Sequence, residues 1–346
     1  MRIAVVGPTG FGGGQNATHA ILRFLQSHNY DVVFFDDRID SPPPRWWRGY
    51  HRLRRMLFRE GPARDVIQNQ IADTIRAGGF TTVIGVQAGD VLLRDLPCRK
   101  IFFCRAPAAH ELYFKLAQWT LDPSDRIRAV ETSRRRELEV FRSSDHVTIA
   151  WKTYEDYIRR YVYDGPNIVS HPRGGWTGCY PRRERASFNG PPALVYLGGL
   201  GKYYNNMELL ARLSSSLPYS LDVYGSRPPG KGHSLRYAGP MQDTDSQLTK
   251  YQFGINTVSR ELLRRQGFSS KIFMYLSYGL PCLFAEWEEF PHELGGCVPY
   301  NEANIEGVIE RFSERRAWEE LSDQAYAQSQ ELSWDKVLEP LLDLLA

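Results

Sequence analysis

The stretch QGFSSKIFMYLSYGLPCLFAE, residues 266–286, is typical of a helix that turns at Gly-Leu-Pro into a buried strand. Two serines precede Lys271, and serine is a favoured residue at a helix N-cap. A lysine in the first helical turn is unfavourable for the helix dipole, so a bound anion would explain its presence. A solvated lysine on an ordinary helix is the alternative interpretation.

Apolar runs on either side of this stretch alternate with helical segments, which predicts α/β architecture with parallel sheets covered on both faces. The runs of the second half lie at 193–199, 221–226, 235–240, 252–258 and 281–286. Those of the first half lie at 2–7, 31–36, 81–86, 100–105 and 146–151. A turn-rich segment, SFNGPP (187–192), separates the halves.

We therefore expect two Rossmann-like, doubly wound domains, residues 1–185 and 190–330, facing a central cleft. The Leu-rich helix expected at 330–346 should cross back to the first domain. Ligands of open α/β sheets bind outside the carboxyl ends of the strands, so both sheets should present binding loops to the cleft.

Composition predicts a soluble cytoplasmic protein. The 346 residues are 42% hydrophobic and 24% charged, and no apolar run approaches the roughly 20 residues of a membrane-spanning helix. The opening MRIAVVGPTG predicts a strand instead of a signal peptide. The five cysteines are odd in number and lack Cys-x-x-Cys spacing, which indicates neither a disulfide framework nor a zinc site.

The glycine-rich segment VVGPTGFGGG admits a competing interpretation, because its spacing and the acids Asp36 and Asp37 fit a dinucleotide-binding loop. Short-chain dehydrogenases with that loop also need Tyr-x-x-x-Lys, which the chain lacks. We expect the loop to line the cleft instead and to allow close approach of donor phosphates or acceptor. Its residues are Gly12, Gly13, Gly14, Gln15 and Asn16.

The segment Ser270-Lys271 through Gly279-Leu280-Pro281 resembles the late motif of GT-B glycosyltransferases, especially family 4 and the related xanthan-type glucuronosyltransferases. ALVYLGGLGKYYNN, LDVYGS, RYAGPM and the terminal SWDKVLEPLLDLL also resemble segments of that family, so the likeness covers most of the chain. The chain departs from family 4 at Gln266 and Met274, where that family carries two glutamates. Retaining or inverting stereochemistry therefore stays open.

The resemblance implies a donor site in the second domain. Lys271, together with Lys202, would neutralise the diphosphate of the leaving nucleotide. With two lysines available, a metal ion need not be invoked, and we expect neither metal nor cofactor. The donor-binding residues implied are Gly199, Lys202, Tyr224, Gly225, Pro240, Met241, Ser269, Ser270, Lys271 and Met274.

The first domain should supply a base for the acceptor hydroxyl. Asp90 follows the expected strand 81–86, and His110 and Glu111 follow the strand 100–105, so all three should lie at the cleft end of the sheet. Each could equally be a helix cap or a surface residue.

Residues 45–59 contain six arginines and no acid. On a helix, aromatic residues would form one stripe and arginines the opposite one, which suits an anionic membrane surface. Packing of the aromatic side on the first sheet, with solvated arginines, is the alternative. We define the membrane patch as Trp46, Trp47, Arg48, Arg52 and Arg55.

Together these features predict a hexosyltransferase that uses a UDP- or GDP-sugar and a glycan or polyprenyl-diphosphate-linked acceptor in bacterial polysaccharide or glycoconjugate assembly. It would be cytoplasmic, peripheral on the inner face of the plasma membrane if the patch binds lipid, and would not bind nucleic acid. The alternatives are a GT-B-shaped sugar-nucleotide epimerase, a catalytically silent GT-B subunit and an NAD(P)-dependent short-chain-type enzyme.

Overall fold

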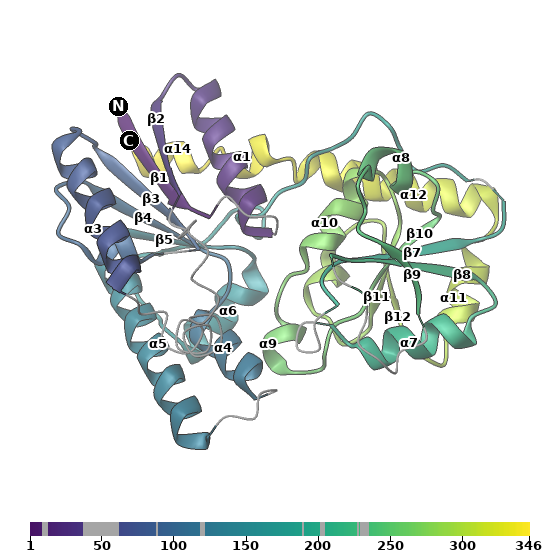
Figure 1. Cartoon of the computed structure of the whole chain (residues 1–346). Helices are drawn as coiled ribbons and strands as arrows, with labels where there is room; N and C mark the ends of the chain where they lie inside the picture. Colours follow the sequence, from purple (N-terminus) through teal and green to yellow (C-terminus); the bar gives the residue numbers. More distant parts are fainter. Residues whose placement is uncertain are drawn as a thin grey trace. The chain divides into compact units, whose positions relative to one another are not determined.

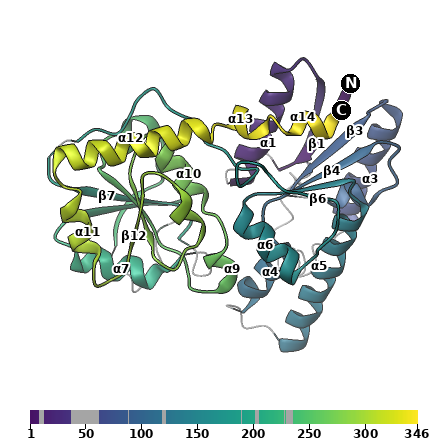
Figure 2. The same ribbon diagram turned by 180° about the vertical axis from the view of Figure 1, so that it is seen from behind.

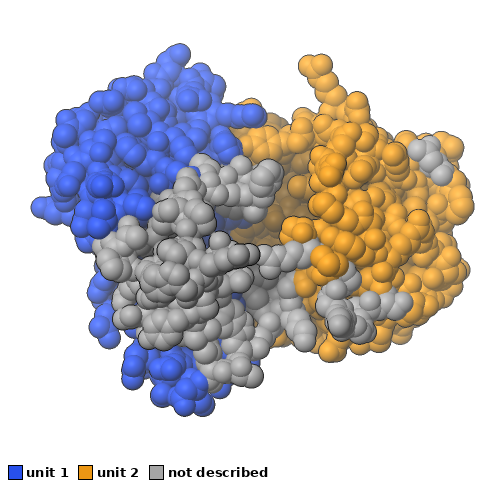
Figure 3. Space-filling view, in the orientation of Figure 1, with its two compact units in different colours: residues 1–176, 337–346 blue, residues 177–336 orange. Residues whose placement is uncertain are grey.

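The computed structural model describes residues 1–8, 13–36, 62–87, 89–117, 122–188, 190–200, 205–226, 228 and 235–346. The chain forms two compact units, residues 1–176 with 337–346, and residues 177–336 (Figure 3). Each unit contains one six-stranded sheet whose paired strands are all parallel. Figures 1 and 2 show helices on both faces of each sheet, as the apolar runs predict.

The sheet of the first unit has the strand order β2-β1-β3-β4-β5-β6. Its central strands are the expected apolar runs, and all five residues of β3 are buried. The strands are β1 (Arg2–Gly7), β2 (Asp31–Asp36), β3 (Thr82–Val86), β4 (Arg99–Cys104), β5 (His146–Ile149) and β6 (Ile168–Val169). The helices are α1 (Gly13–Ser27), α3 (Pro62–Ala77), η2 (Asp90–Leu93), α4 (Ala108–Leu116), α5 (Pro123–Ser143) and α6 (Lys152–Tyr161).

The sheet of the second unit has the order β12-β11-β10-β7-β8-β9. Its strands are β7 (Ala193–Leu197), β8 (Ser220–Tyr224), β9 (Arg236–Gly239), β10 (Phe253–Asn256), β11 (Cys282–Ala285) and β12 (Cys297–Tyr300). Its helices are α7 (Met207–Ser216), α8 (Thr244–Leu248), α9 (Leu262–Arg265), α10 (Ser270–Ser277), η3 (Phe290–Glu293), α11 (Ile305–Arg311) and α12 (Arg315–Glu331). The helix α10 and the strand β11 lie where the stretch 266–286 predicts them.

Both sheets reverse their winding direction at an inner strand. In the first sheet the chain runs from β1 out to β2 and then returns to β3 on the other side of β1. In the second it runs from β7 out to β9 and then returns to β10 beside β7. Loops diverge at such a switch point and leave space for a ligand at the carboxyl ends of the two strands. The loops after β7 and β10 are therefore the first place to look for a site in the second unit.

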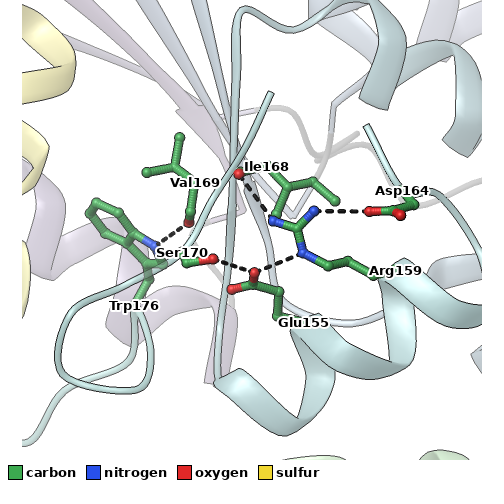
Figure 4. Close-up of polar contacts among 7 residues, drawn as sticks. All are labelled: Glu155, Arg159, Asp164, Ile168, Val169, Ser170 and Trp176. Carbon is green, nitrogen blue, oxygen red and sulfur yellow. Dashed lines mark hydrogen bonds and ion pairs between the residues drawn. The ribbon is translucent and has the colours of Figure 1, made fainter. Parts of the chain in front are cut away.

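The edge strand β6 was missed in the sequence because it has only two residues; polar contacts hold it in place. Arg159 of α6 donates from Nη2 to the carbonyl oxygen of Ile168 at 3.2 Å, and its Nε bonds Glu155 at 2.9 Å (Figure 4). Trp176 Nε1 donates to the carbonyl oxygen of Val169 at 3.2 Å. Side-chain hydrogen bonds thus help to fix the pairing register of β6, which two residues with polar neighbours cannot fix by themselves.

The chain enters the second unit at residue 177, earlier than the linker composition indicates. The segment after Thr177 is tied to that unit by backbone bonds, from Cys179 to the carbonyl of Leu332 at 2.7 Å and from Ala186 to that of Tyr278 at 2.8 Å. At the other end, residues 337–346 return to the first unit. They form part of α13 (Trp334–Leu338) and all of α14 (Leu341–Leu345), two helices where the sequence predicts one, because Pro340 disfavours helical backbone at the residue before it.

Candidate functional site

The loop after β7 places glycines at the switch point of the second sheet. Gly198 has a φ of +141°, which side-chain-bearing residues rarely adopt. A Cβ atom on Gly198 would lie 3.2 Å from Cε of Lys271, and one on Gly225 would lie 2.7 Å from the carbonyl oxygen of Gly198. A Cβ atom on Gly199 would meet no described atom within 4 Å. The loop therefore needs glycine for close approach on one side and leaves room on the other.

Lys271 extends from the first turn of α10 toward this glycine loop. Its ammonium group donates to Oδ1 of Asn205 at 2.9 Å and lies 4.9 Å from the ring centre of Tyr196. Asn205 in turn donates to the carbonyl oxygen of Gly199 at 2.5 Å. Burial lowers the pKa of Lys271, and the carboxylate of Glu288 acts in the opposite direction. A partly buried cation is thus held against a glycine loop, which suits an anionic ligand such as a phosphate group.

A buried amide and a buried carboxylate hold the N-terminus of α10 in position through hydrogen bonds. Ser269, the N-cap residue, donates from Oγ to Oδ1 of Asn256 at 3.0 Å. Nδ2 of Asn256 donates to Oε2 of Glu288, and the backbone nitrogen of Ala285 donates to Oε1 at 3.2 Å. Asn256 and Glu288 are 0% and 1% exposed. Because Ser269 Oγ donates to Asn256, it does not cap the backbone N–H groups at the start of α10.

Two hydroxyl groups near this cluster are buried without a hydrogen-bond partner in the part of the chain that the structure describes. They belong to Tyr196, at the end of β7, and Thr257, directly after β10, and both residues are 0% exposed. Buried polar groups are normally satisfied. Their position at the switch point adds two groups to which a ligand or a solvent molecule could form hydrogen bonds.

The other donor residues expected from the sequence are distributed along the same edge of the sheet. Ser270 is exposed and Met274 is partly buried on α10. Tyr224 ends β8 and shares a hydrogen bond with Tyr251 at 2.9 Å. Pro240 and Met241 directly follow β9, and Lys202 lies outside the described residues. No sequence pattern indicated Asn205, Tyr196, Asn256 or Glu288, all of which contact or influence Lys271 or its helix.

In the first unit, His110 lies on α4, one turn after the carboxyl end of β4. Its Nδ1 is 2.7 Å from the hydroxyl oxygen of Tyr157 on α6. Burial, together with the positive charge of Arg134, lowers the pKa of His110 from its ordinary value, so the ring is neutral at pH 7. In the tautomer whose Nδ1 donates to Tyr157, Nε2 is a free base. This arrangement can accept a proton from a hydroxyl group.

Asp90 and Glu111 have different surroundings. Asp90 opens η2, is 8% exposed and accepts from Nε of Arg136 at 2.7 Å. Glu111 lies in the first turn of α4 and is partly buried. The N-terminus of that helix is occupied by Glu137 of α5, whose Oε1 accepts from the backbone nitrogen of Ala108 at 2.5 Å.

Asp90, Arg136 and Glu137 also line a cavity of about 50 Å³, which α5 and the loops after β3 and β4 enclose. Asp90 is therefore part of a partly buried ion pair beside a small cavity, whereas His110 does not line that cavity.

Part of the sequence-predicted site lies outside the described residues. Gly12 and the whole membrane patch, Trp46, Trp47, Arg48, Arg52 and Arg55, are in this group. Gly13, Gly14, Gln15 and Asn16, which the sequence indicated as part of the glycine loop, form the first turn of α1. Within the ranges that the structure covers, no helix is long and apolar enough to cross a membrane.

The same described residues contain no group of three or more His, Cys, Asp or Glu side chains that could hold a metal ion. One Asp-x-Asp sequence, Asp243-Thr244-Asp245, escaped the sequence analysis. The structure uses both carboxylates internally: Asp243 caps α8 by accepting from the backbone nitrogen of Ser246 at 3.2 Å, and Asp245 accepts from the hydroxyl of Tyr278.

Comparison with known proteins finds no matching family model and no matching curated protein sequence. Solved structures do match over the whole chain. WaaG, a glycosyltransferase involved in lipopolysaccharide biosynthesis, superposes with a TM-score of 0.63 at 12% identity, covering 99% of both chains.

The lipopolysaccharide outer core galactosyltransferase WaaB gives 0.59 at 12% identity, covering 100% of both chains. An α-glucosyltransferase in complex with UDP gives 0.58 at 10% identity, covering 100% of this chain and 99% of the other. At these identities the likeness concerns the fold. Two parallel six-stranded sheets with flanking helices, matched along their whole length to such enzymes, give this chain the GT-B fold.

Proposed function

We propose that the chain is a hexosyltransferase that moves a sugar from a UDP- or GDP-sugar to a glycan or polyprenyl-diphosphate-linked glycan in bacterial polysaccharide or glycoconjugate assembly. The observation that carries the proposal is Lys271, a partly buried cation held by Asn205 against the glycine loop at the switch point of the second sheet. Glycosyltransferases of the same fold support it, and one of them is in complex with UDP.

On the donor side, Lys271 and the N–H groups at the start of α10, which no side chain caps, would bind the diphosphate. Negative charge grows on the leaving nucleotide as the bond to the sugar breaks, so a cation held nearby stabilises the transition state. We propose that this charge is supplied by protein side chains and that the reaction needs no added divalent metal. Activity that persists undiminished in excess EDTA would support this part of the proposal, and recovery only with added Mg²⁺ or Mn²⁺ would contradict it.

On the acceptor side, His110 is the best placed of the three candidate bases. Its ring is neutral at pH 7, and Tyr157 holds its Nδ1. Asp90 is already engaged with Arg136 in an ion pair. We therefore assign to His110 the removal of the proton from the acceptor hydroxyl group. We assign to Asp90 the stabilisation of the loop after β3 through its ion pair with Arg136.

The decisive experiment compares ligand binding by the natural protein, Lys271→Ala and Lys250→Ala. Lys250 is exposed and distant in sequence from α10, so it controls for the loss of one positive charge. A thermal-shift screen covers UDP, GDP, ADP, dTDP, NAD and NADP. A ligand at a hundred times its Kd adds about 2.7 kcal/mol of stability, which raises the Tm measurably.

We expect one nucleoside diphosphate to stabilise the natural protein and Lys250→Ala equally. Lys271→Ala should lose about 1.5–3 kcal/mol of binding free energy, the value of a charge-assisted hydrogen bond, or roughly 10- to 160-fold in affinity. Equal affinity in both variants would refute the donor site. Stabilisation by NAD or NADP alone would instead favour the dinucleotide interpretation of the loop after β1.

Incubation of the natural protein with the matching nucleotide-sugar and no acceptor separates the remaining classes. A transferase should at most hydrolyse the donor slowly, whereas an epimerase would convert it to another sugar nucleotide. A catalytically silent subunit would neither convert the donor nor transfer its sugar to any acceptor supplied afterwards.

A further inference from the structure

Glu288 is a buried acid in the second unit that the proposed chemistry does not yet use. It follows β11 in the loop AEWEEF, where an acid is usually a surface residue, yet it is 1% exposed. Burying an ionisable group without partners is costly, so its surroundings must compensate. Both oxygens accept hydrogen bonds, one from Asn256 Nδ2 and one from the backbone nitrogen of Ala285.

These bonds connect Glu288 to the start of α10. Asn256 accepts from Ser269 Oγ at 3.0 Å through its other side-chain atom, and its backbone carbonyl accepts from the hydroxyl of Tyr300 at 3.2 Å. Asn256 can offer its amide nitrogen to Glu288 and its oxygen to Ser269 only in one orientation. The carboxylate therefore sets the orientation of the amide, and the amide sets the position of the N-cap serine, two residues before Lys271.

Charge makes a second link between Glu288 and Lys271. Glu288 exerts the largest stabilising charge effect on the Lys271 ammonium group, and Lys271 exerts the same kind of effect on Glu288. Burial opposes both charges, since it lowers the pKa of Lys271 to about 8 and raises that of Glu288 to about 8, so both groups change charge in the same pH range. The neighbouring Arg264 lowers the pKa of Lys271 further, whereas Cys282 raises it. After burial, the charge of Glu288 also raises the pKa values of Tyr196 and Tyr300.

We propose that Glu288 is a positioning residue of the nucleotide site, which orients the N-cap of α10 through Asn256 and serves as the buried counter-charge that keeps Lys271 an ammonium ion. The inference rests on the proposed function only where a nucleotide is invoked. A bound diphosphate would itself pair with the Lys271 ammonium group. Glu288 therefore matters chiefly in the protein without nucleotide, where it keeps Lys271 charged and correctly positioned.

The first test needs no nucleotide. Protein labelled with ¹⁵N-lysine is titrated, and the Nζ resonance of Lys271 is assigned by its loss in Lys271→Arg. We expect a pKa below the ordinary value of 10.5. Glu288→Gln should lower it by about one further unit or more, because the opposite charge is gone. An unchanged Lys271 pKa in a folded Glu288→Gln protein overturns the proposal, whether or not the chain is a transferase.

The second test measures UDP or GDP affinity between pH 6 and pH 9. Binding should weaken as pH rises through the pKa of Lys271, since the neutral amine no longer attracts phosphate. In Glu288→Gln the midpoint of this loss should move to lower pH, with affinity closest to that of the natural protein at pH 6. A merely structural role for Glu288 would instead lower affinity by one constant factor at every pH.

Glu288→Asp is the conservative partner of these variants. It keeps the charge, so it should restore most of the Lys271 pKa and return the midpoint toward its natural position. If Glu288→Gln does not fold, Glu288→Ala replaces it as the variant without the charge. An unchanged Lys271 pKa in a folded Glu288→Ala protein overturns the proposal in the same way.

Discussion

The two units share one architecture but use the carboxyl ends of their sheets differently. In the second unit, glycines, a cation and two hydroxyls without described partners gather where the winding direction reverses. In the first unit, the described polar groups near the strand ends mostly engage one another: Asp90 bonds Arg136, and Glu137 bonds the start of α4. We therefore expect a charged ligand to bind in the second unit, whereas the first holds a histidine in a defined orientation.

The largest expected effect tests whether His110 is the one reactive group of the first unit. His110→Ala should lower kcat about 10²- to 10⁴-fold, the usual contribution of a general base, while leaving nucleotide affinity in the second unit unchanged. Steady-state kinetics and a nucleotide titration measure the two quantities separately. An equal loss of nucleotide affinity would show that His110 also contributes to nucleotide binding, which contradicts the assignment of binding to the second unit alone.

Asp90→Asn is the matched comparison for His110→Ala. It weakens a partly buried charged hydrogen bond to Arg136, so we expect a loss of about 1.5–3 kcal/mol in the free energy of unfolding and a smaller effect on kcat. Denaturant unfolding measures the first quantity. If instead kcat falls by orders of magnitude while stability holds, Asp90 is the base and His110 supports it.

The pH dependence of kcat sharpens the assignment of the base. Burial and Arg134 lower the pKa of His110 below its ordinary value of 6.5. A base must be unprotonated, so activity should be full at pH 7 and fall as pH drops through that lowered pKa. A rate profile between pH 4.5 and 8 measures the acid limb. A limb centred above pH 6.5 would contradict the assignment.

A smaller effect concerns the membrane patch, which lies outside the described residues. The exchange of Arg48, Arg52 and Arg55 for alanine should cost about 3 kcal/mol of affinity for vesicles rich in anionic lipid, near 1 kcal/mol for each arginine. Co-sedimentation with anionic and with neutral vesicles measures it. Binding that is equal for both lipid types, or unchanged by the exchange, would favour a patch that packs on the protein.

The sequence allowed most of the fold to be predicted because ten of the strands that the structure describes overlap the apolar runs at 2–7, 31–36, 81–86, 100–105, 146–151, 193–199, 221–226, 235–240, 252–258 and 281–286. The two that it did not predict, β6 and β12, lack that signal: β6 has two residues, and β12 contains Pro299 at a sheet edge. The residues of the candidate site were harder to predict from the sequence than the strands. Lys271 carries a local signal, two serines before a helix, but Glu288 looks like a surface acid in a charged loop. Its role depends on Asn256, 32 residues earlier, and His110 depends on Tyr157, 47 residues later.

The smallest expected effect separates a glycine that packs from a glycine that serves a ligand. Gly198→Ala would place a methyl group 3.2 Å from Cε of Lys271, so the ammonium group must shift. We expect about 1 kcal/mol of lost nucleotide affinity, about fivefold, in addition to backbone strain of about 1–3 kcal/mol in stability. Gly190→Ala is the control, because Gly190 also has a positive φ but a Cβ atom there would meet nothing within 4 Å.

In the first unit, Gly7 ends the corresponding inner strand, and its Cβ atom would meet Thr18 and Val86 at 3.1 Å. Gly7→Ala should therefore reduce stability without changing how the second unit binds a nucleotide. Isothermal titration and denaturant unfolding of the three variants measure both quantities. If Gly198→Ala loses only stability and Gly7→Ala loses affinity, the nucleotide is bound by the first unit, and the contrast between the two sheet edges is reversed.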